Sequence, residues 1–456
     1  MQIKELLNYL GIESNDEQII TDVVTSTNDV VEGCVLILTK GNNVNPVLLL
    51  NQKIKKMCAL ILTEEIVEGC IYIENLRIRT FEIIDYVYFR RKHNFKIIGI
   101  TGSEGKSSLA KIIHQGLNIS RNKSLLISNE KQGYNTFYSS LTTPSAKDII
   151  NAMLICEKKK FNYLIMEVSS IGIEENRVDL TIFDYIFLTN LESDHLDYHQ
   201  NIYQYHLSKI KLLQQNIKGK KFIFFETYNK YPNLFNRVTN KIIIDEKLIK
   251  QKRSSLTHQV FIYRNKEYYT HLIFKQNRKN LVFIIEFFNL LKIRNVEYVV
   301  KKIKRIKGRL DLLHSRPYIM IDYAHSKQSV DNVLNQLSSF KQNRIIVVIG
   351  AGGNRDKSKR SEYGKSCLKY ADLIYVTNDN PRNEDPYSIA KMIVPFNNEK
   401  FIIELNRKLA IKKAIKEANV DDIVVILGRG NEEYQIINDK RIPLSDYEEV
   451  NKCLMD

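Results

Sequence analysis

The residues with the clearest chemical meaning lie at positions 99–107, which read Gly-Ile-Thr-Gly-Ser-Glu-Gly-Lys-Ser. They follow an apolar run and precede a helical pattern, an order typical of a phosphate-binding loop. The glycines allow a tight turn whose N–H groups face an anion, while Lys106 can reach the outer phosphates and Ser107 can hold Mg2+. The generic pattern G-x-x-x-x-G-K-S is not met, because Ile100 stands at its first position. We therefore predict a nucleotide site whose reaction must be inferred from other residues.

Carboxylates and histidines follow at two further predicted strand ends. Glu167 closes the apolar run 163–166, which places it at the carboxyl edge of the same sheet, where it would meet the magnesium ion of a nucleotide. Residues 188–199, LTNLESDHLDYH, concentrate histidines and carboxylates, as metal and phosphate sites do. Lys209 follows in a helical pattern. Taken alone, Glu167 fits a surface strand end better than a metal ligand, and Lys209 fits a solvated helix face.

Two loops in the C-terminal part of the chain carry arginines. Arg355 lies in the glycine-rich turn 350–356, and Arg382 lies in the loop 379–386, which two prolines make rigid. Because a guanidinium group binds a carboxylate with two hydrogen bonds, these loops indicate a substrate with an acidic group. Arg309 precedes a predicted strand and Asp322 ends one, again at the carboxyl edge of parallel strands, where ligands bind.

Strands that alternate with helices along most of the chain predict an α/β fold with parallel sheets covered on both faces. A chain of 456 residues exceeds what one core usually serves, so we expect three domains, at 1–90, 91–312 and 313–456. Helices are expected near 3–10 and 408–418, and a hairpin within the tyrosine-rich stretch 253–271. The expected strands are 34–38, 58–62, 124–127, 163–166, 185–188, 221–225, 319–322, 344–349, 373–377 and 423–427.

The composition argues against several other classes of protein. The net charge is +16, but 68 Lys and Arg are scattered among 52 acidic residues, which favours a genome-wide codon bias over a nucleic-acid-binding surface. The six cysteines show no C-x-x-C spacing, so we expect reduced thiols. No apolar run approaches the roughly 20 residues that span a bilayer, and we expect no signal peptide, because no basic segment followed by an apolar core stands at positions 1–30. We expect a cytoplasmic protein without membrane insertion.

Taken together and in order, these motifs closely resemble the Mur ligases of peptidoglycan synthesis, and among them the MurE type. The resemblance runs from the phosphate loop to Gln435, and the glycine spacing that breaks the generic pattern is the spacing this family uses. It implies a three-domain Mur ligase fold, with an N-terminal domain for the UDP end of the substrate, a central P-loop parallel-sheet ATPase domain and a C-terminal Rossmann-like α/β domain. It also implies a monomeric, ATP-dependent and Mg2+-dependent amide ligase that adds meso-diaminopimelate to UDP-MurNAc-L-Ala-D-Glu through an acyl phosphate.

The resemblance also implies roles for particular residues. The catalytic and metal-binding set would be Lys106, Ser107, Glu167, His195 and Lys209, the last as the carbamylated lysine of the family. ATP would contact Gly102, Ser103, Glu104, Gly105, Lys106, Ser107, Ser108, Asn190, Asn280, Arg309 and Asp322. The UDP-substrate would contact Thr27, Thr142, Thr143, Ser169 and Arg177. The pocket for the incoming amino acid would contain Arg355, Asn380, Arg382, Gly428 and Glu432. The Asp-Asn-Pro-Arg loop at 379–382 is the version associated with diaminopimelate, whose extra carboxylate suits Arg382.

The match is poorest in the first 90 residues. The Asp-Ser-Arg motif of the family reads Ser26-Thr-Asn28, so only Thr27 and Lys40 are candidates for uridine contacts. Ile171, Lys307 and Asn431 also replace residues that the family pattern expects near its substrates. Three alternatives therefore stay open: a Mur-like ligase with a different acceptor or amino acid, such as lysine or a secondary-metabolite intermediate; a regulatory protein with an inactive ATP site; and a nucleic-acid-dependent NTPase.

Overall fold

The computed structural model describes residues 1–40, 45–130, 133–192, 198–394, 398–438 and 440–455. The chain folds into two compact units, one made of residues 1–247 and 282–294 and the other of residues 248–281 and 295–456. The division into three domains at 90/91 and 312/313 remains a prediction. None of the helices in the described ranges combines the length and apolar character needed to cross a membrane.

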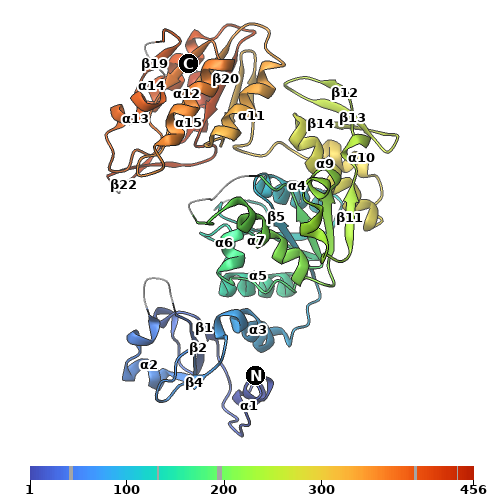
Figure 1. Cartoon of the computed structure of the whole chain (residues 1–456), viewed down its shortest axis with the longest axis vertical. Helices are drawn as coiled ribbons and strands as arrows, with labels where there is room; N and C mark the ends of the chain where they lie inside the picture. The colour runs from blue at the N-terminus through green and yellow to red at the C-terminus, as the bar shows by residue number, and fades with distance from the viewer. Residues whose placement is uncertain (41–44, 131–132, 193–197, 395–397, 439, 456) are drawn as a thin grey trace. The chain divides into compact units, whose positions relative to one another are not determined.

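The first unit begins with a small sheet of four parallel strands, drawn in blue in Figure 1. Its order is β1-β2-β3-β4, and the predicted strands 34–38 and 58–62 are confirmed. The strands are β1 Val23–Val24, β2 Cys34–Leu38, β3 Cys58–Thr63 and β4 Ile71–Tyr72, and the helices are α1 Ile3–Tyr9, η1 Thr27–Asp29, η2 Pro46–Leu49, α2 Gln52–Met57 and α3 Leu76–Phe89.

A second sheet of the same unit has seven parallel strands in the order β11-β10-β9-β5-β8-β6-β7. The strands are β5 Lys96–Thr101, β6 Ser124–Ser128, β7 Thr136–Tyr138, β8 Tyr163–Glu167, β9 Tyr185–Leu188, β10 Lys220–Phe224 and β11 Lys241–Ile244. The helices are α4 Lys106–Ile119, α5 Ala146–Lys159, α6 Ser170–Glu174, α7 Ile202–Gln215, α8 Phe225–Lys230, η3 Pro232–Phe235 and the end of α9 Lys275–Leu290. Because β5 lies between β8 and β9, the segments that follow these three strands meet at one edge.

Helices cover both faces of this sheet, which explains why its strands read as continuous apolar runs. On one face, Met166 and Leu188 pack in the same buried cluster as Met153 of α5. On the other face, the ring of Phe187 packs edge-to-face against Phe287 of α9 at 5.4 Å. The expected parallel α/β architecture is therefore confirmed here.

Ion pairs join the small sheet to the larger one within the first unit. Lys147 of α5 donates hydrogen bonds to the carboxylate of Asp22 and, at 2.7 Å, to the carbonyl of Val23. Arg91 bridges Asp85 of α3, at 2.9 Å, and Asp179, at 2.8 Å. These contacts cross the position where the sequence predicts a domain boundary.

The second unit contains a six-stranded sheet in the order β15-β16-β20-β17-β18-β19, in which only β15 is antiparallel to its neighbour. Its strands are β15 Asp311–Ser315, β16 Tyr318–Asp322, β17 Ile345–Ile349, β18 Leu373–Val376, β19 Phe401–Ile403 and β20 Ile423–Leu427. Its helices are η4 Glu246–Leu248 in part, α10 Val296–Lys302, α11 Lys327–Ser338, α12 Ser358–Tyr370, α13 Pro386–Ile393, α14 Arg407–Glu417 and α15 Asp446–Met455. The loops that follow β16, β20, β17 and β18 meet at one edge of the sheet.

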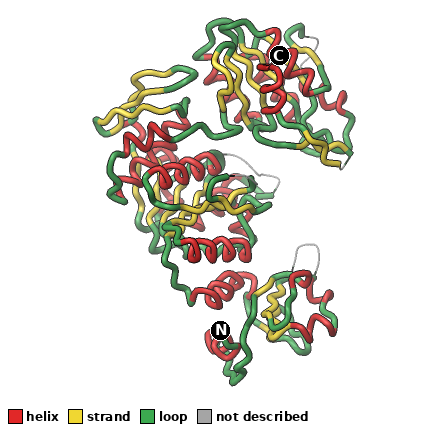
Figure 2. The backbone as a smooth tube through the Cα atoms, turned by 180° about the vertical axis from the view of Figure 1, so that it is seen from behind, coloured by secondary structure: helices red, strands yellow, loops and turns green. Residues whose placement is uncertain are grey.

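Two smaller antiparallel sheets complete the second unit, and both stand apart from the larger sheet in Figure 2. The hairpin predicted within 253–271 is a three-stranded sheet, β12 Lys250–Ser254, β13 Gln259–Tyr263 and β14 Lys266–Thr270. The prediction missed the start of β12 because its sequence, Lys-Gln-Lys-Arg-Ser, has no apolar alternation. A two-stranded hairpin pairs β21 Tyr434–Ile437 with β22 Lys440–Pro443.

Candidate functional site

The predicted phosphate loop connects β5 to α4 and has the backbone that its glycines allow. Gly102 has φ +137° and Gly105 has φ +81°, both in the region that favours glycine. A Cβ atom at Gly102 would lie 1.9 Å from Oγ1 of Thr189 and 3.1 Å from the backbone N and O of Asn190. The segment after β9 therefore packs directly against the loop, and no residue larger than glycine fits at position 102.

Two backbone N–H groups of the loop share one acceptor, and its lysine lies against the loop carbonyls. The backbone N–H groups of Ser103 and Glu104 both donate to Oδ1 of Asn190, at 3.1 and 3.0 Å. Nζ of Lys106 donates to the carbonyls of Gly102 and Ser103, at 2.8 and 2.9 Å. Two N–H groups that hold one amide oxygen are arranged to hold a phosphate oxygen, with a lysine beside them and a helix N-terminus behind them. Ser108 lies in the first turn of that helix.

Ser107 and Glu167 meet at the same edge. Oγ of Ser107 donates to Oε2 of Glu167 at 2.9 Å, and Glu167 is buried at the end of β8. Hydroxyl and carboxylate oxygens are ligands that Mg2+ prefers, so this pair fits a magnesium ion beside a nucleotide. Among the residues that the structure describes, no three His, Cys, Asp or Glu side chains gather as a metal site. His195, the predicted histidine ligand, lies outside the described residues.

Lys209 is buried on α7, and its Nζ lies 2.9 Å from the centroid of the Tyr205 ring. One turn earlier, Nε2 of His206 lies 3.3 Å from the carbonyl of Glu192. Oγ of Ser103 donates to that same carbonyl at 2.9 Å, so α7 and the phosphate loop share one hydrogen-bonded network. Burial lowers the pKa of His206. His206 is not among the predicted site residues, because a lone histidine in a helical pattern does not indicate a site.

Three of the predicted contacts to the UDP-substrate, Thr143, Ser169 and Arg177, lie together. Ser169 donates its N–H to Oγ1 of Thr143 at 2.8 Å, and Arg177 donates to the carbonyl of Thr143 at 3.1 Å. Arg177 also forms an ion pair with Glu175. Thr142 is exposed on the loop before α5. Nε2 of His199, the last histidine of the predicted cluster, lies 3.0 Å from Oγ of Ser170.

Asn280, Arg309 and Asp322 belong to the second unit. Asn280 is fully buried on α9, and its Nδ2 finds no hydrogen-bond partner among the described residues. Asp322 accepts the N–H groups of Leu310 and Ala324, both at 2.7 Å. Its burial raises the pKa of its carboxyl group, although the nearby Arg309 acts in the opposite direction.

The loops at the carboxyl edge of the six-stranded sheet bring together most of the predicted amino-acid pocket. Nδ2 of Asn380 donates to Oε2 of Glu432 at 3.0 Å, and burial raises the pKa of Glu432. A Cβ atom at Gly428 would lie 2.7 Å from Oδ2 of Asp379, so a second carboxylate lies directly against position 428. Nη1 of Arg382 donates to the carbonyl of Gly353 at 2.7 Å. The predicted Arg355 lies on the same edge but is exposed.

Arg429 is a residue of this pocket that the sequence analysis missed. It is fully buried, and its Nη1 donates to Oδ1 of Asn380 at 3.3 Å. A charged side chain between two glycines is typical of a solvent-exposed turn. The one available signal was its position inside the motif Gly-Arg-Gly-Asn-Glu, where it replaces a lysine of the family pattern.

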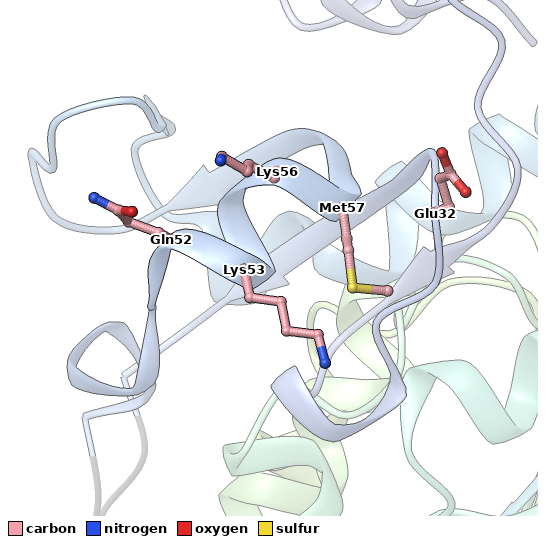
Figure 3. Close-up of a pocket in the computed structure, with 5 residues that line it drawn as sticks. All are labelled: Glu32, Gln52, Lys53, Lys56 and Met57. Atoms are coloured by element: carbon pink, nitrogen blue, oxygen red, sulfur yellow. The ribbon is translucent and has the colours of Figure 1, made fainter.

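Thr27 and Lys40, the candidates for uridine contacts, follow β1 and β2 of the small N-terminal sheet. Thr27 is half-buried in η1, and the exposed Lys40 donates its backbone N–H to Glu64 at 3.1 Å. A cavity of about 500 Å3 lies where β2 and β3 begin, lined by Glu32, Gln52, Lys53, Lys56 and Met57. Figure 3 shows Lys53 and Met57 extending to one side of α2 while Gln52 and Lys56 extend to the other. Because these side chains do not converge, the cavity gives no support to a uridine site.

Comparison with known proteins shows which family the sequence matches. Residues 100–297 match the family model "Mur ligase middle domain", and residues 308–430 match "Mur ligase, glutamate ligase domain". A relative in Rickettsia typhi is 30% identical over 95% of this chain and 93% of its own length, and one in Clostridium perfringens is 31% identical over 98% of both. Each is named UDP-N-acetylmuramoyl-L-alanyl-D-glutamate--2,6-diaminopimelate ligase. A solved structure of a protein with that name has a TM-score of 0.71 and 22% identity, and the alignment covers 100% of this chain and 99% of that one.

Proposed function

This chain belongs to the Mur ligase family of ATP-dependent amide ligases, and from that premise we propose that it joins 2,6-diaminopimelate to UDP-N-acetylmuramoyl-L-alanyl-D-glutamate. Both substrates are small molecules, and the reaction supplies a precursor of peptidoglycan. The observation that carries the proposal is the phosphate loop with its Ser107–Glu167 pair, in a chain that aligns over almost its whole length with relatives named for this reaction.

The reaction divides into two steps. An oxygen of the acceptor carboxylate forms a bond to the γ-phosphorus of ATP, the bond to the bridging oxygen breaks, and ADP leaves with that electron pair. The amino group of the incoming amino acid then attacks the carbonyl carbon of the acyl phosphate, phosphate leaves, and the nitrogen loses a proton to give the amide. Family membership implies ATP and Mg2+, and a bound Mg2+ would neutralise charge on the phosphates.

The residues of the phosphate loop would stabilise the first step. Lys106 and the N–H groups of Ser103 and Glu104 supply positive charge and hydrogen bonds where the transferred phosphoryl group gathers negative charge. In this structure Oδ1 of Asn190 accepts the hydrogen bonds of those two N–H groups, so a phosphate oxygen would have to displace it. Ser107 and Glu167 would hold the metal ion.

The carboxyl-edge pocket of the second unit would take the amino acid. Glu432 and Asp379 offer negative charge to an ammonium group, and Arg382 offers a guanidinium group to a carboxylate. We expect Arg382→Ala to weaken the reaction with diaminopimelate more than the reaction with lysine, which lacks the second carboxylate. An equal loss with both amino acids would contradict this role.

Carbamylation of Lys209 is a further part of the proposal. Nζ would first lose a proton to become a neutral amine, and addition of CO2 with loss of a second proton would convert the side chain into a carbamate carboxylate that can bind Mg2+. Burial on α7 supports this role, because it would shield such a carbamate from water. Carbon-13 NMR in labelled bicarbonate should show one carbamate signal that is absent from Lys209→Ala. Its presence in the variant would contradict the assignment.

One observation favours a second candidate, a ligase with a changed acceptor. Arg177, a predicted contact to the muramyl dipeptide, already forms an ion pair with Glu175, which places a carboxylate where an acidic acceptor would bind.

A screen of ADP release separates the two candidates. It crosses UDP-MurNAc-dipeptide and other UDP-muramyl acceptors with diaminopimelate, lysine and ornithine. We expect release only when UDP-MurNAc-L-Ala-D-Glu and diaminopimelate are both present. Release with another acceptor alone would establish the second candidate, and no release with any pair would refute both. Size-exclusion chromatography and cell fractionation test the predicted monomeric state and cytoplasmic location.

A further inference from the structure

The loop that carries Arg382 is held along its length by the hairpin β21–β22. The N–H of Arg382 donates to the carbonyl of Ile436, and the N–H of Asn438 donates to the carbonyl of Arg382, both at 3.0 Å. The side-chain amide of Gln435 donates to the carbonyl of Asp379. The hairpin therefore pairs with the loop almost as a third strand would, and Arg382 and Ile437 form a parallel bridge.

Arg382 has a backbone conformation that needs such support. Its φ is +52°, in the left-handed region that residues other than glycine adopt only when their surroundings hold them there. The two hydrogen bonds to Ile436 and Asn438 fix this conformation from both sides of the residue. The direction in which the guanidinium group leaves the loop thus depends on the hairpin.

Arg429 and the hairpin also fix the side chain of Asn380. Oδ1 of Asn380 accepts the N–H of Ile436 at 2.8 Å and Nη1 of Arg429 at 3.3 Å. Only Nδ2 is then left to face Glu432, so the amide cannot turn over without placing two donors against each other. Nη2 of Arg429 donates to the carbonyls of Tyr434 and Leu444, at 2.7 and 3.1 Å, which ties both ends of the hairpin to the same buried guanidinium group.

We propose that Gln435 and Arg429 are positioning residues that determine which amino acid the enzyme accepts, by holding Arg382 and Asn380 in their binding orientations. This inference rests on the proposed function, because it takes the carboxyl-edge pocket as the amino-acid site. Asn380 and backbone carbonyls accept from Nη1 and Nη2 of Arg429, and the carbonyl of Asp379 accepts from Nε2 of Gln435, so both residues act on the substrate through others. Selectivity would then be encoded partly in a hairpin that follows the pocket motif in sequence.

Gln435→Ala is the variant that tests this most cleanly. Gln435 lines a cavity of about 380 Å3 between the hairpin and the start of α14, so its truncation enlarges an existing space and should not prevent folding. Loss of one hydrogen bond to Asp379 should raise the KM for diaminopimelate roughly three-fold to ten-fold and leave the KM for ATP within about two-fold. Gln336→Ala on α11 is the matched control, since it also removes one glutamine that donates to a backbone carbonyl, and it should change neither constant.

A double-mutant cycle separates positioning from a general loss of structure. The ratio of kcat/KM for diaminopimelate to that for lysine should fall in Gln435→Ala, and it should not fall further when Gln435→Ala is added to Arg382→Ala, because both act through one guanidinium group. Arg429→Lys keeps the charge but cannot reach all three acceptors, so it should show an intermediate loss of the same ratio.

Two results would overturn the inference: additive effects in the cycle, or an unchanged KM for diaminopimelate in a folded Gln435→Ala. If the unmodified enzyme releases no ADP with diaminopimelate, the proposed function itself fails, and that outcome is seen before any variant is made.

Discussion

The packing of Gly102 makes Gly102→Ala a demanding test of the phosphate loop. The new Cβ would lie 1.9 Å from Oγ1 of Thr189, so this hydroxyl must move. Its single O–H is shared between the carbonyls of Glu104, at 2.6 Å, and Thr101, at 3.3 Å. Losing this hydrogen bond costs about 1 kcal/mol, and a positive φ adds about 1–3 kcal/mol. The sum, about 2–4 kcal/mol, corresponds to a roughly thirty-fold to thousand-fold loss of kcat/KM for ATP.

The assay is ADP release at varied ATP, together with thermal denaturation of each variant. Gly11→Ala is the matched control, because Gly11 has φ +83° but nothing lies within 4 Å of a Cβ atom there. It should lower stability by about 1 kcal/mol and leave the KM for ATP unchanged. The double variant Gly102→Ala/Thr189→Ala removes the closest contact and should recover part of the activity that the single variant loses. A single variant within three-fold of the unmodified enzyme, or a double variant no better than the single one, would refute the reasoning.

Two further predictions concern stability. Because burial lowers the pKa of His206 below the ordinary 6.5, the unfolded chain binds a proton that the folded one does not, and stability should fall as pH drops below about 6.5. Between pH 7.5 and pH 5, the melting temperature of His206→Gln should fall less than that of the unmodified protein. An equal fall in both would exclude this histidine as a cause. Asp446→Ala should cost about 3–5 kcal/mol in urea unfolding, because Asp446 is the carboxylate partner of the buried Arg407 at 2.7 Å; a cost below about 1 kcal/mol would show that the pair is dispensable.

Sequence patterns predicted the strands well because a buried parallel strand is a continuous apolar run. Strands 34–38, 185–188 and 423–427 match to the residue. The end predicted at Phe225 is wrong, because that residue begins α8, and an aromatic residue continues an apolar run whichever element it belongs to. Parallel order also explains why the loops after β5, β8 and β9 could be expected at one edge.

The pairing of particular side chains in the site could not be predicted in the same way. Asn190 is far from the phosphate loop in sequence, and nothing in its neighbourhood shows that its amide oxygen faces the N–H groups of Ser103 and Glu104. Arg429 carries a charge that a pattern assigns to solvent, yet it is fully buried because three acceptors surround it. Such contacts depend on the packing of distant segments rather than on local periodicity.

The contacts of Lys147 and Arg91 decide where this chain can be cut. A fragment that begins at residue 91 would keep both cations and lose Asp22 and Asp85, while the complementary fragment would keep those carboxylates without their partners. Apolar residues on both sides of the boundary, such as Phe81 and Ile150, also belong to one buried cluster. The first 90 residues are thus folded together with the seven-stranded sheet, so their contribution to substrate preference should be studied by exchanging residues within the whole chain rather than by exchanging this segment as a module.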